Sequence, residues 1–543
     1  MTYVHPIQQF LKRVEATPHK SYLHQPKSGQ WKTYSWSEVD TQARTIATAL
    51  QAQGFEKGDR IAILAKNSME WIVADLAIAM AGLISVPIYS TAGEDTIAYV
   101  LAHSGSKAIF VGKLDGYEAL NAANPGLPTI GFPYPGVEAD IQWLDWLQQY
   151  SPQQDIVISA LQDTYTIVYT SGSTGNPKGV VLTAENLVAG ATAVADLYPS
   201  DDDSMLSYLP MAHITERCLV NMCSLFSQVE IFFNESLDTF LADLQHAKPT
   251  IFLTVPRLWA KFQAQILAKM PDKRLQRILS IPLIGRWFAG KIRKQLGFGS
   301  CLSFGSGTAP ISPSLLHWWG RLGVDIAEGW GMTEISGAGA SNSPFETSRL
   351  GTIGVPLSSF EFKLADNGEL LVRGDSVFKE YYKNPEATAD AFEDGWFKTG
   401  DKAKLDANGS WSITGRVKEQ FKTAKGKYVA PVPIESLLEA DIFIEQSCVV
   451  GSGMSQPVGL VVISEQQGAT KDDVEKSLVT TLNSVNKQLE SHERLDHIVV
   501  AKQPWSIENG LLTPTLKLKR SDIEQQFTSM LEQGFSDQVI WQS

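Results

Sequence analysis

The first half of the chain alternates between segments with helical spacing and short strand-like runs, and this alternation constrains the fold most strongly. Residues 36–53 space apolar side chains three and four positions apart, as one face of a helix requires. Residues 60–65 (RIAILA) are typical of a strand, residues 68–83 return to the helical pattern, and residues 84–89 return to a strand. The pattern recurs near residues 103–112, 163–197 and 227–233. Such alternation predicts parallel strands with helices packed on the faces of the sheets.

The tail beyond about residue 415 has a different pattern. It combines short strand-like runs with a helical stretch at residues 471–490, which is typical of a small α+β domain. Residues 399–416 (TGDKAKLDANGSWSITGR) are rich in turn formers and predict a hairpin that leads into a linker. We therefore predict an α/β fold with two domains. A large N-terminal body of several subdomains (1–414) has parallel sheets flanked by helices, and a small mobile α+β domain (415–543) follows.

Composition excludes several classes of protein. The formal net charge of −13 does not suit a general nucleic-acid coat, so we expect no nucleic-acid partner. The four cysteines lack CxxC spacing, which argues against a disulfide scaffold or a structural zinc site and favours a reducing compartment. The N-terminus shows no secretory signal. The most apolar stretch, residues 72–89, is interrupted by Asp75 and Pro87 and is shorter than the ~20 residues of a membrane span. We expect a cytoplasmic protein.

A loop dense in glycine and hydroxyl groups follows a predicted strand at residues 164–169. It runs through Thr170, Ser171, Gly172, Ser173, Thr174 and Gly175, with Asn176 and Lys178 just beyond. Glycine lets backbone N–H groups approach an anion, hydroxyls add donors, and Lys178 adds a charge for phosphate oxygens. A helix N-capped by Thr183 is expected to follow. Because the spacing does not match the GxxxxGK[ST] of a P-loop, the pattern indicates a phosphate site of another kind.

The segment YTSGSTGNPKG (residues 169–179) resembles the signature loop of the adenylate-forming (AMP-binding) superfamily, which includes acyl-CoA synthetases, peptide-synthetase adenylation domains and luciferases. Further motifs match in the family's order, so the resemblance covers residues 165–520 directly. It implies that ATP and Mg²⁺ bind here, with Thr170 and Glu334 sharing the metal ion. The ATP- or AMP-binding positions that it implies are Ser171, Gly172, Ser173, Thr174, Gly175, Lys178, Gly307, Thr308, Glu328, Gly329, Trp330, Gly331, Met332, Thr333, Asp401 and Arg416.

Two of these motifs surround the purine in the family. Residues 303–310 (SFGSGTAP) resemble the turn that borders the adenine and the acyl carboxylate. Residues 328–334 (EGWGMTE) resemble the family's GYGxTE, with tryptophan in place of tyrosine. Trp330 keeps a ring face for the purine. Glu334 offers the hard oxygen ligand that Mg²⁺ prefers.

The positions around the linker resemble the family's ribose-binding and hinge residues. Asp401 would accept hydrogen bonds from both ribose hydroxyls, and Arg416 would donate to the ribose or to a phosphate. Lys418 matches the hinge position, where relatives carry aspartate or lysine. Residues 419–435 resemble the loop used in the second reaction step, in which Gly426 would approach the pantetheine channel of coenzyme A.

Two further positions follow from the resemblance. Residues 208–217 (YLPMAHITER) are similar to a motif of long-chain acyl-CoA synthetases whose histidine, here His213, lines the acyl pocket. Some relatives place a gating tryptophan four residues later, where this chain has Arg217, so that gate is not carried over. Residues 511–520 (LLTPTLKLKR) resemble the turn that holds the family's catalytic lysine, here Lys517.

The chemistry of this family explains why such groups are needed. A carboxylate oxygen attacks the α-phosphate of ATP, so two anions must approach, and fixed cations and backbone donors lower that barrier. Lys517 would bridge the two anions, and the thiol of coenzyme A would then attack the acyl-adenylate after the small domain has rotated. We predict an AMP-forming acyl-CoA synthetase for a long- or medium-chain fatty acid. The alternatives are a ligase that loads an acyl-carrier protein or releases acyl-AMP, and a non-catalytic acyl or nucleotide sensor.

Residues 271–294 form a basic stretch in an otherwise acidic chain. They hold seven Lys or Arg against one Asp, and Leu, Ile, Trp287 and Phe288 interleave with the cations. An amphipathic basic helix of this kind could contact anionic lipid or an acidic carrier protein. The alternative is a surface helix that is docked by its apolar face. Contact with lipid would place the protein at the inner face of a membrane, where it would collect fatty acid.

Overall fold

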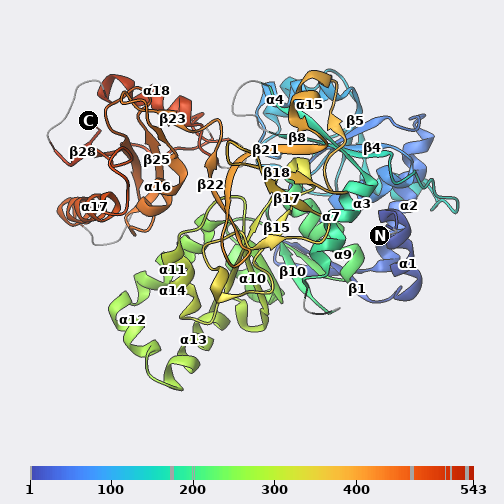
Figure 1. The fold of residues 1–543 in the computed structure, drawn as a ribbon. Coiled ribbons are helices and arrows are strands. Elements are labelled where there is room, and N and C mark those ends of the chain that lie inside the picture. Colours follow the sequence, from blue (N-terminus) through green and yellow to red (C-terminus); the bar gives the residue numbers. More distant parts are fainter. Residues whose placement is uncertain are drawn as a thin grey trace.

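The computed structural model describes residues 3–170, 176–198, 200, 202–464, 470–507, 509–513, 517–531 and 537–542. Figure 1 shows a large body and a smaller lobe formed by the C-terminal elements. The lobe lies to one side of the body, and the chain enters it after strand β22 (Trp411–Arg416). The described residues thus form two parts of unequal size.

The sheet that carries the glycine-rich loop has the strand order β19-β9-β8-β4-β3-β5-β6-β7. Strands β3 to β8 pair in parallel, whereas β9 and β19 are antiparallel at one edge. The predicted alternation of helices and parallel strands is confirmed here. The bounds are β3 (Arg60–Leu64), β4 (Ile84–Ile88), β5 (Ser106–Val111), β6 (Thr129–Gly131), β7 (Ile141–Gln142), β8 (Thr164–Thr170), β9 (Lys178–Thr183) and β19 (Glu380–Tyr381).

A second sheet of the body has the order β16-β15-β14-β13-β12-β10-β11-β1-β2, and its inner strands are also parallel. A third, antiparallel sheet joins β17, β18, β20, β21 and β22. The bounds of these strands are β1 (Ser21–Lys27), β2 (Gln30–Ser35), β10 (Ser204–Ser207), β11 (Glu230–Phe233), β12 (Ile251–Thr254), β13 (Ser303–Ser306), β14 (Ile326–Trp330), β15 (Ala340–Ser341), β16 (Val355–Pro356), β17 (Glu361–Leu364), β18 (Glu369–Arg373), β20 (Phe392–Glu393) and β21 (Trp396–Leu405).

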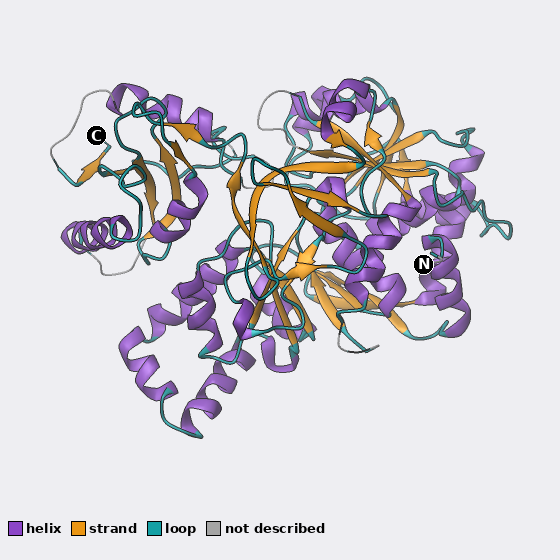
Figure 2. Ribbon diagram, viewed as in Figure 1, coloured by secondary structure: helices purple, strands orange, loops and turns teal. Residues whose placement is uncertain are grey.

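Helices pack around the sheets of the body (Figure 2). Their starts follow local signals: Ser35 forms a capping box with Glu38, and Thr183 caps the helix after the glycine-rich loop, as predicted. The bounds are α1 (Pro6–Ala16), α2 (Trp36–Ala52), α3 (Met69–Met80), α4 (Glu94–Ser104), α5 (Glu118–Ala123), α6 (Trp143–Gln149), α7 (Ala184–Ala195), α8 (Ile214–Glu216), α9 (Cys223–Ser227), α10 (Phe240–Ala247), α11 (Pro256–Lys269), α12 (Asp272–Leu279), α13 (Ile284–Gln295), α14 (Pro313–Gly320) and α15 (Pro385–Ala391).

Helix α3 accounts for most of the apolar stretch at residues 72–89. Every residue of α3 is buried, and Asp75 within it pairs with Arg217, which is buried completely. The stretch is therefore a core helix that leads into β4. Among the described residues, we find no helix with the length and apolar character that crossing a membrane demands. The four cysteines are free thiols.

The lobe has its own four-stranded sheet, in which β25 and β26 are antiparallel and β26, β27 and β28 are parallel. Its two apolar clusters contain only residues beyond position 420, which is consistent with a separate core. The boundary between residues 414 and 415 stays a prediction. The bounds in the lobe are β23 (Phe421–Lys422), β24 (Tyr428–Val429), α16 (Pro431–Leu438), β25 (Ile444–Val450), β26 (Val458–Ile463), α17 (Lys471–Asn486), β27 (Ile498–Val500), α18 (Arg520–Leu531) and β28 (Val539–Trp541).

Two features differ from the sequence-based expectation. The glycine-rich loop does not lead straight into a helix, because the antiparallel strand β9 lies between them. Thr183 is the last residue of β9 and the N-cap of α7. Residues 271–294 form two helices, α12 and α13, and not one. The chain breaks between them at Pro282, which cannot continue a helix, and at Leu283, which has a positive φ of 64°.

Candidate active site

The hairpin β8–β9 fixes the two ends of the glycine-rich loop. Thr170 ends β8, Lys178 begins β9, and the Thr170 hydroxyl donates to the Lys178 carbonyl over 3.4 Å. The positions predicted between them, Ser171, Gly172, Ser173, Thr174 and Gly175, lie outside the described residues. A phosphate site in this loop would therefore be held between two hydrogen-bonded strands.

Tyr381 links two of the predicted residues and was not identified from the sequence. Its hydroxyl donates to Oε1 of the buried Glu334 over 2.8 Å. The ammonium of Lys178 lies over its ring, 4.7 Å from the centroid. Strand β19 pairs with β9, which brings Tyr381 opposite Val180 and so beside Lys178. The only sequence signal was a pair of tyrosines, and their position relative to the loop depends on the fold.

A second cluster joins Trp330, Asp401 and Arg416. Trp330 ends β14, and its indole N–H donates to Oδ2 of Asp401 over 2.8 Å. Arg416 lies directly opposite Asp401 in the β21–β22 ladder, and its Nε is 2.7 Å from Oδ1. Burial raises the pKa of Asp401, while Arg416 opposes that shift. The structure brings these three predicted residues together, and it shows that the Trp330 indole N–H has a partner in Asp401.

The glycines around Trp330 allow the backbone to approach closely. A Cβ on Gly331 would lie 2.0 Å from the Gly337 carbonyl oxygen, so no side chain fits there. Glu328 precedes them and accepts a hydrogen bond from the Gly351 N–H over 2.8 Å; burial raises its pKa to about 8. Met332 and Thr333 follow in the turn that leads to Glu334.

The turn after β13 lies beside this cluster, because a Cβ on Gly307 would lie 3.3 Å from the Gly329 carbonyl oxygen. Thr308 is exposed and has φ +70°, a conformation that costs a non-glycine residue energy. Ser306 is buried, and its hydroxyl has no hydrogen-bond partner among the described residues. An unsatisfied hydroxyl next to a strained exposed residue is suited to a polar ligand.

His213 and Glu216 lie at the start of the helical segment that follows β10. It caps α8, and its Nδ1 accepts from the Thr215 N–H over 3.2 Å, while burial lowers its pKa to about 4. Glu216 on the same helix accepts from the Ser207 hydroxyl over 2.6 Å, and burial raises its pKa to about 8. His213 is therefore neutral near pH 7. Arg217 points into the core toward Asp75, so it does not replace the tryptophan gate of some relatives.

Lys517 reaches the site from the lobe. Its carbonyl accepts from the Thr513 N–H over 2.8 Å, and its own N–H donates to the Thr513 hydroxyl over 3.1 Å. The surrounding protein removes part of its hydration and lowers its pKa, and Arg416 lowers it further, whereas Asp401 and Glu334 act in the opposite direction. Its charge also lowers the pKa of His213. The charge of Lys517 therefore interacts with residues of both clusters, namely Glu334 of the first and Asp401 and Arg416 of the second.

The positions predicted for the second step follow strand β22 along the chain. Lys418 is exposed in the turn just after β22. Gly426 has φ +76° in the turn between β23 and β24, and its N–H donates to the Thr423 carbonyl over 2.9 Å. A left-handed conformation at this turn favours glycine.

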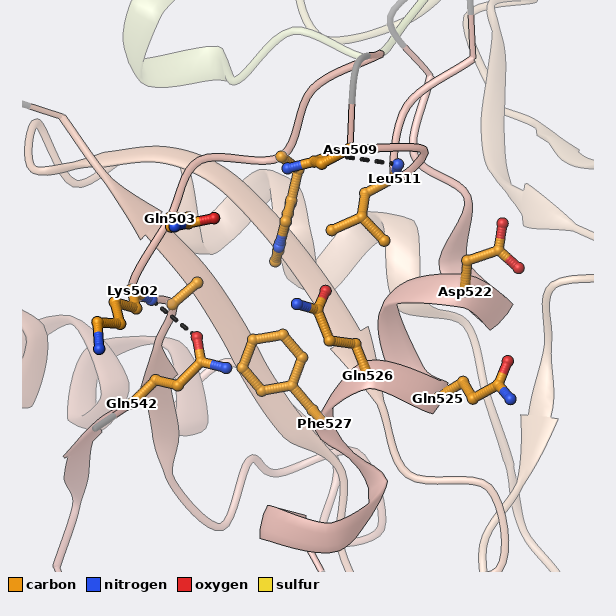
Figure 3. Close-up of a pocket in the computed structure, with 11 residues that line it drawn as sticks. Lys502, Gln503, Asn509, Leu511, Asp522, Gln525, Gln526, Phe527 and Gln542 are labelled. Atoms are coloured by element: carbon orange, nitrogen blue, oxygen red, sulfur yellow. Dashed lines mark hydrogen bonds between the residues drawn. The ribbon is translucent and has the colours of Figure 1, made fainter.

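A hollow on the lobe is a separate feature (Figure 3). It is formed by the loop after β27, by α18 and by the C-terminal end, with Lys502, Gln526, Phe527 and Gln542 among its side chains. The described residues that line it include none of the predicted site positions. The candidate site consists of the cluster of Lys178, Tyr381 and Glu334, the second cluster of Trp330, Asp401 and Arg416, and Lys517 from the lobe.

Comparison with protein families gives two matches. The model described as AMP-binding enzyme matches residues 10–382, and the model described as AMP-binding enzyme C-terminal domain matches residues 418–538. Among curated proteins, Long-chain-fatty-acid–CoA ligase FadD15 of Mycobacterium bovis is 32% identical over 93% of this chain and 92% of its own. Fatty acyl-CoA synthetase A of Dictyostelium discoideum is 30% identical over 95% of this chain and 88% of its own.

Solved structures show the same fold. The anthranilate CoA ligase AuaEII, in complex with anthranoyl-AMP, matches with a TM-score of 0.83 at 20% identity and covers 98% of both chains. The o-succinylbenzoate CoA synthetase of Bacillus subtilis, in complex with its acyl-adenylate, matches with a TM-score of 0.75 at 21% identity and covers 96% of this chain and 99% of its own. The predicted fold class, a large α/β body followed by a smaller lobe, is confirmed.

Proposed function

The chain belongs to the AMP-binding enzyme family, and on that premise we propose that it is an AMP-forming acyl-CoA synthetase. It activates a long- or medium-chain fatty acid with ATP, releases pyrophosphate, and transfers the acyl group from acyl-AMP to coenzyme A. The relatives named as long-chain fatty acid ligases support this substrate class. The observation that carries the proposal is Lys517, a lobe residue under the electrostatic influence of Asp401, Arg416 and Glu334 of the body.

The nucleotide is held by the second cluster. The face of Trp330 packs against the adenine, and Asp401 accepts from the ribose hydroxyls. Each carboxylate oxygen has a second lone pair beside the one used by Trp330 or Arg416, so both oxygens can accept another hydrogen bond. The other positions that we propose contact ATP or AMP are Ser171, Gly172, Ser173, Thr174, Gly175, Lys178, Gly307, Thr308, Glu328, Gly329, Gly331, Met332 and Thr333.

The residues present fit a magnesium ion shared with the nucleotide. Glu334 uses Oε1 for Tyr381, which leaves Oε2 for a hard cation, and Thr170 adds a hydroxyl. Magnesium takes one or two carboxylates together with phosphates and waters. A cluster of three or more His, Cys, Asp or Glu side chains is therefore not required, and the described part of the chain has none. When bound, the ion would neutralise charge on the phosphates.

Adenylation needs no protein nucleophile. Lys517 attracts both the fatty acid carboxylate and the α-phosphate, so the carboxylate oxygen can attack phosphorus while pyrophosphate departs. Lys178 stabilises the departing phosphates as a point charge. His213 is neutral and lines the acyl pocket, so it places no charge beside the hydrocarbon tail of the fatty acid.

The second step uses the same lobe in another orientation. We place the hinge at Lys418, which is exposed just after the last strand of the body. Rotation there withdraws Lys517 and brings the Gly426 turn toward the thiol channel. In this proposal the predicted domains, 1–414 and 415–543, move relative to each other about Lys418, so that Arg416 at the end of β22 stays with the part that binds ATP and the acid.

The cellular setting is part of the same proposal. The protein works in the cytoplasm, and residues 271–294 contact either the inner surface of a membrane or an acidic carrier protein. A fatty acid, ATP and coenzyme A are the small-molecule partners.

The test separates the two steps with Lys517→Ala. This variant should lose ATP–pyrophosphate exchange but still form thioester from preformed acyl-AMP, because only the first step uses the lysine. Lys519→Ala is the matched control: Lys519 lies two residues away, partly exposed, 4.0 Å from Asp522. Equal loss of both steps in Lys517→Ala would contradict the role assigned to this residue.

The substrate is tested by AMP release with straight-chain acids of two to eighteen carbons. We expect release to increase toward the longer chains. Coenzyme A and acyl-carrier protein are then compared as acceptors, and acylation of the carrier alone would contradict the proposed acceptor. Absence of pyrophosphate exchange with every acid would favour a non-catalytic sensor.

A further inference from the structure

The α12–α13 hairpin projects from the body, away from the three sheets (Figure 1). Its base is well anchored. Leu275 is fully buried, and Asp272, the one acidic residue of the 271–294 segment, accepts a hydrogen bond from the Trp318 indole N–H over 2.9 Å. On α13, Arg293 donates to the Gly323 carbonyl over 2.8 Å. The inner faces of the helices are therefore docked on the body, as the surface-helix alternative expects.

The tip of this hairpin is not docked. Ile281 is 45% exposed, Leu283 78%, Ile284 53% and Trp287 67%. These four residues, which we call the apolar tip, lie within seven positions of the chain, at the turn between α12 and α13 and in the first turn of α13. Isolated exposed apolar residues are ordinary, whereas a contiguous group marks an interaction site.

The backbone at the tip is strained at Leu283, whose side chain is exposed to solvent. This residue has φ +64° and ψ −50°, and the Ile284 N–H donates to the Pro282 carbonyl over 2.8 Å. Together these define a classic γ-turn, which is rare and unfavourable for a residue with a side chain. Glycine would relieve the strain, yet the position holds a large leucine that is exposed. Strain of this kind is retained where the side chain has a function.

Cations surround the apolar tip. The segment has seven Lys or Arg in a chain of net charge −13, and its single acid is occupied at the base. Arg286 and Lys291 are exposed on the same helix as Trp287, and the Lys291 ammonium lies 5.7 Å from the centroid of the Trp287 ring. Arg277 is exposed at the end of α12. The tip is therefore apolar at its apex and basic around it.

We propose that the apolar tip inserts into the headgroup region of an anionic lipid bilayer, with the surrounding lysines and arginines on the lipid phosphates. The shape favours a membrane over an acidic protein. Exposed leucine, isoleucine and tryptophan side chains at the end of a projecting hairpin can enter a bilayer, which accommodates them without a preformed pocket. Tryptophan beside lysine and arginine is the side-chain combination typical of the membrane interface.

This inference rests on the proposed function and narrows the contact proposed there for residues 271–294 to a lipid surface, and its readout does not depend on acyl chemistry. The wild-type protein is sedimented with vesicles of phosphatidylcholine alone and of phosphatidylcholine with about 30% phosphatidylserine, a fraction chosen to give a strong negative surface potential. We expect clear binding to the anionic vesicles, weaker binding to the neutral ones, and release in high salt.

Two variants test the two components. Leu283→Asp/Trp287→Asp removes the apolar apex, and Arg286→Glu/Lys291→Glu reverses the charge beside it. Each should weaken binding to anionic vesicles by about 10-fold or more, since each bilayer-facing Lys or Arg contributes about a fivefold factor and two of them together about 25-fold. The matched controls are Leu237→Asp, at a leucine 89% exposed elsewhere on the body, and Lys12→Glu/Lys107→Glu, at two other exposed lysines. Both controls should bind like the wild type.

Pyrophosphate exchange with a water-soluble acid, octanoate, is measured on every variant. It should stay within about twofold of the wild type, because the tip holds no residue of the candidate site; this separates failure of docking from failure of the enzyme. The proposal is overturned if the wild type does not bind anionic vesicles, or if the tip variants bind them as tightly as the controls. If the tip variants lose binding to an acidic carrier protein but bind vesicles like the wild type, the tip contacts a protein partner, and the membrane proposal is overturned as well.

Discussion

Replacement of Tyr381 by phenylalanine tests whether this tyrosine positions the magnesium and phosphate ligands. Tyr381 donates from its hydroxyl to Glu334 over 2.8 Å and offers its ring face to Lys178 at 4.7 Å. Tyr381→Phe removes the hydrogen bond and keeps the ring. Tyr381→Leu removes both. The pair of variants therefore separates the two contacts of one side chain.

The expected magnitudes follow from the two contacts. A hydrogen bond to a charged group contributes about 1.5–3 kcal/mol, so Tyr381→Phe should lower kcat/KM for Mg-ATP by about 10- to 150-fold. A cation–π contact at a side chain as exposed as Lys178 contributes about 0.5–1 kcal/mol, so Tyr381→Leu should lose a further two- to fivefold. Because Glu334 is then held less firmly, the Mg²⁺ concentration needed for half-maximal rate should rise in both variants.

The assay is ATP–pyrophosphate exchange with Mg²⁺ and ATP varied independently. Tyr382→Phe is the control, because the neighbouring hydroxyl makes only a long, 3.5 Å hydrogen bond to the Ser104 carbonyl. It should behave like the wild type. A Tyr381→Phe enzyme with unchanged kcat/KM and unchanged Mg²⁺ dependence would refute the positioning role, as would an equal loss in Tyr382→Phe.

Three further predictions concern buried polar groups. Arg217→Met leaves Asp75 buried without its partner and should lower the free energy of unfolding by about 3–5 kcal/mol in urea denaturation, whereas adding Asp75→Leu should recover most of that loss. Burial raises the pKa of Glu216 from 4.5 to about 8, so the folded state keeps a proton that the unfolded state has released. Stability should therefore fall as pH rises from about 4.5 to about 8, and Glu216→Gln should flatten this decline in thermal denaturation measured across that range. Trp330→Phe keeps a ring face but removes the 2.8 Å hydrogen bond to Asp401, so KM for ATP should rise about tenfold with a smaller change in kcat; an unchanged KM would contradict the role of Trp330 and Asp401 in holding the nucleotide.

Much of the fold follows from local patterns in the sequence. Helix α2 and strand β3 are visible in spacing alone, and the cap at Thr183 sets the start of α7. The hairpin β21–β22 follows from its turn residues, and its register then places Asp401 opposite Arg416. These elements are predictable because neighbours in the chain determine them.

Other features depend on contacts between distant parts of the chain. Strand β9 is missed because its apolar run follows a loop and can be interpreted as the approach to a helix. Tyr381 is missed because its partners, Lys178 and Glu334, are 203 and 47 positions away, and only the folded chain, through the β9–β19 pairing for Lys178, brings them together. The break at Leu283 is missed because helical spacing on either side of Pro282 is preserved. In each case tertiary structure selects among local options that the sequence leaves open.

The arrangement of charge in the site also bears on how the lobe moves. Arg416 belongs to the last strand before the hinge and Lys517 to the lobe. Desolvation lowers the pKa of Lys517, and repulsion by the like charge of Arg416 lowers it further, whereas Asp401 and Glu334 act in the opposite direction. A polyanion between them converts this repulsion into two attractions, so ATP should favour the orientation in which Lys517 faces Arg416. Loss of pyrophosphate and consumption of the carboxylate charge remove most of that negative charge, and the repulsion returns. We therefore expect the orientation used for adenylation to be stable while ATP and the acid are bound, and to become unfavourable once acyl-AMP has formed and pyrophosphate has left. The reaction itself would then drive rotation of the lobe about Lys418, and no further ligand would be needed to start it.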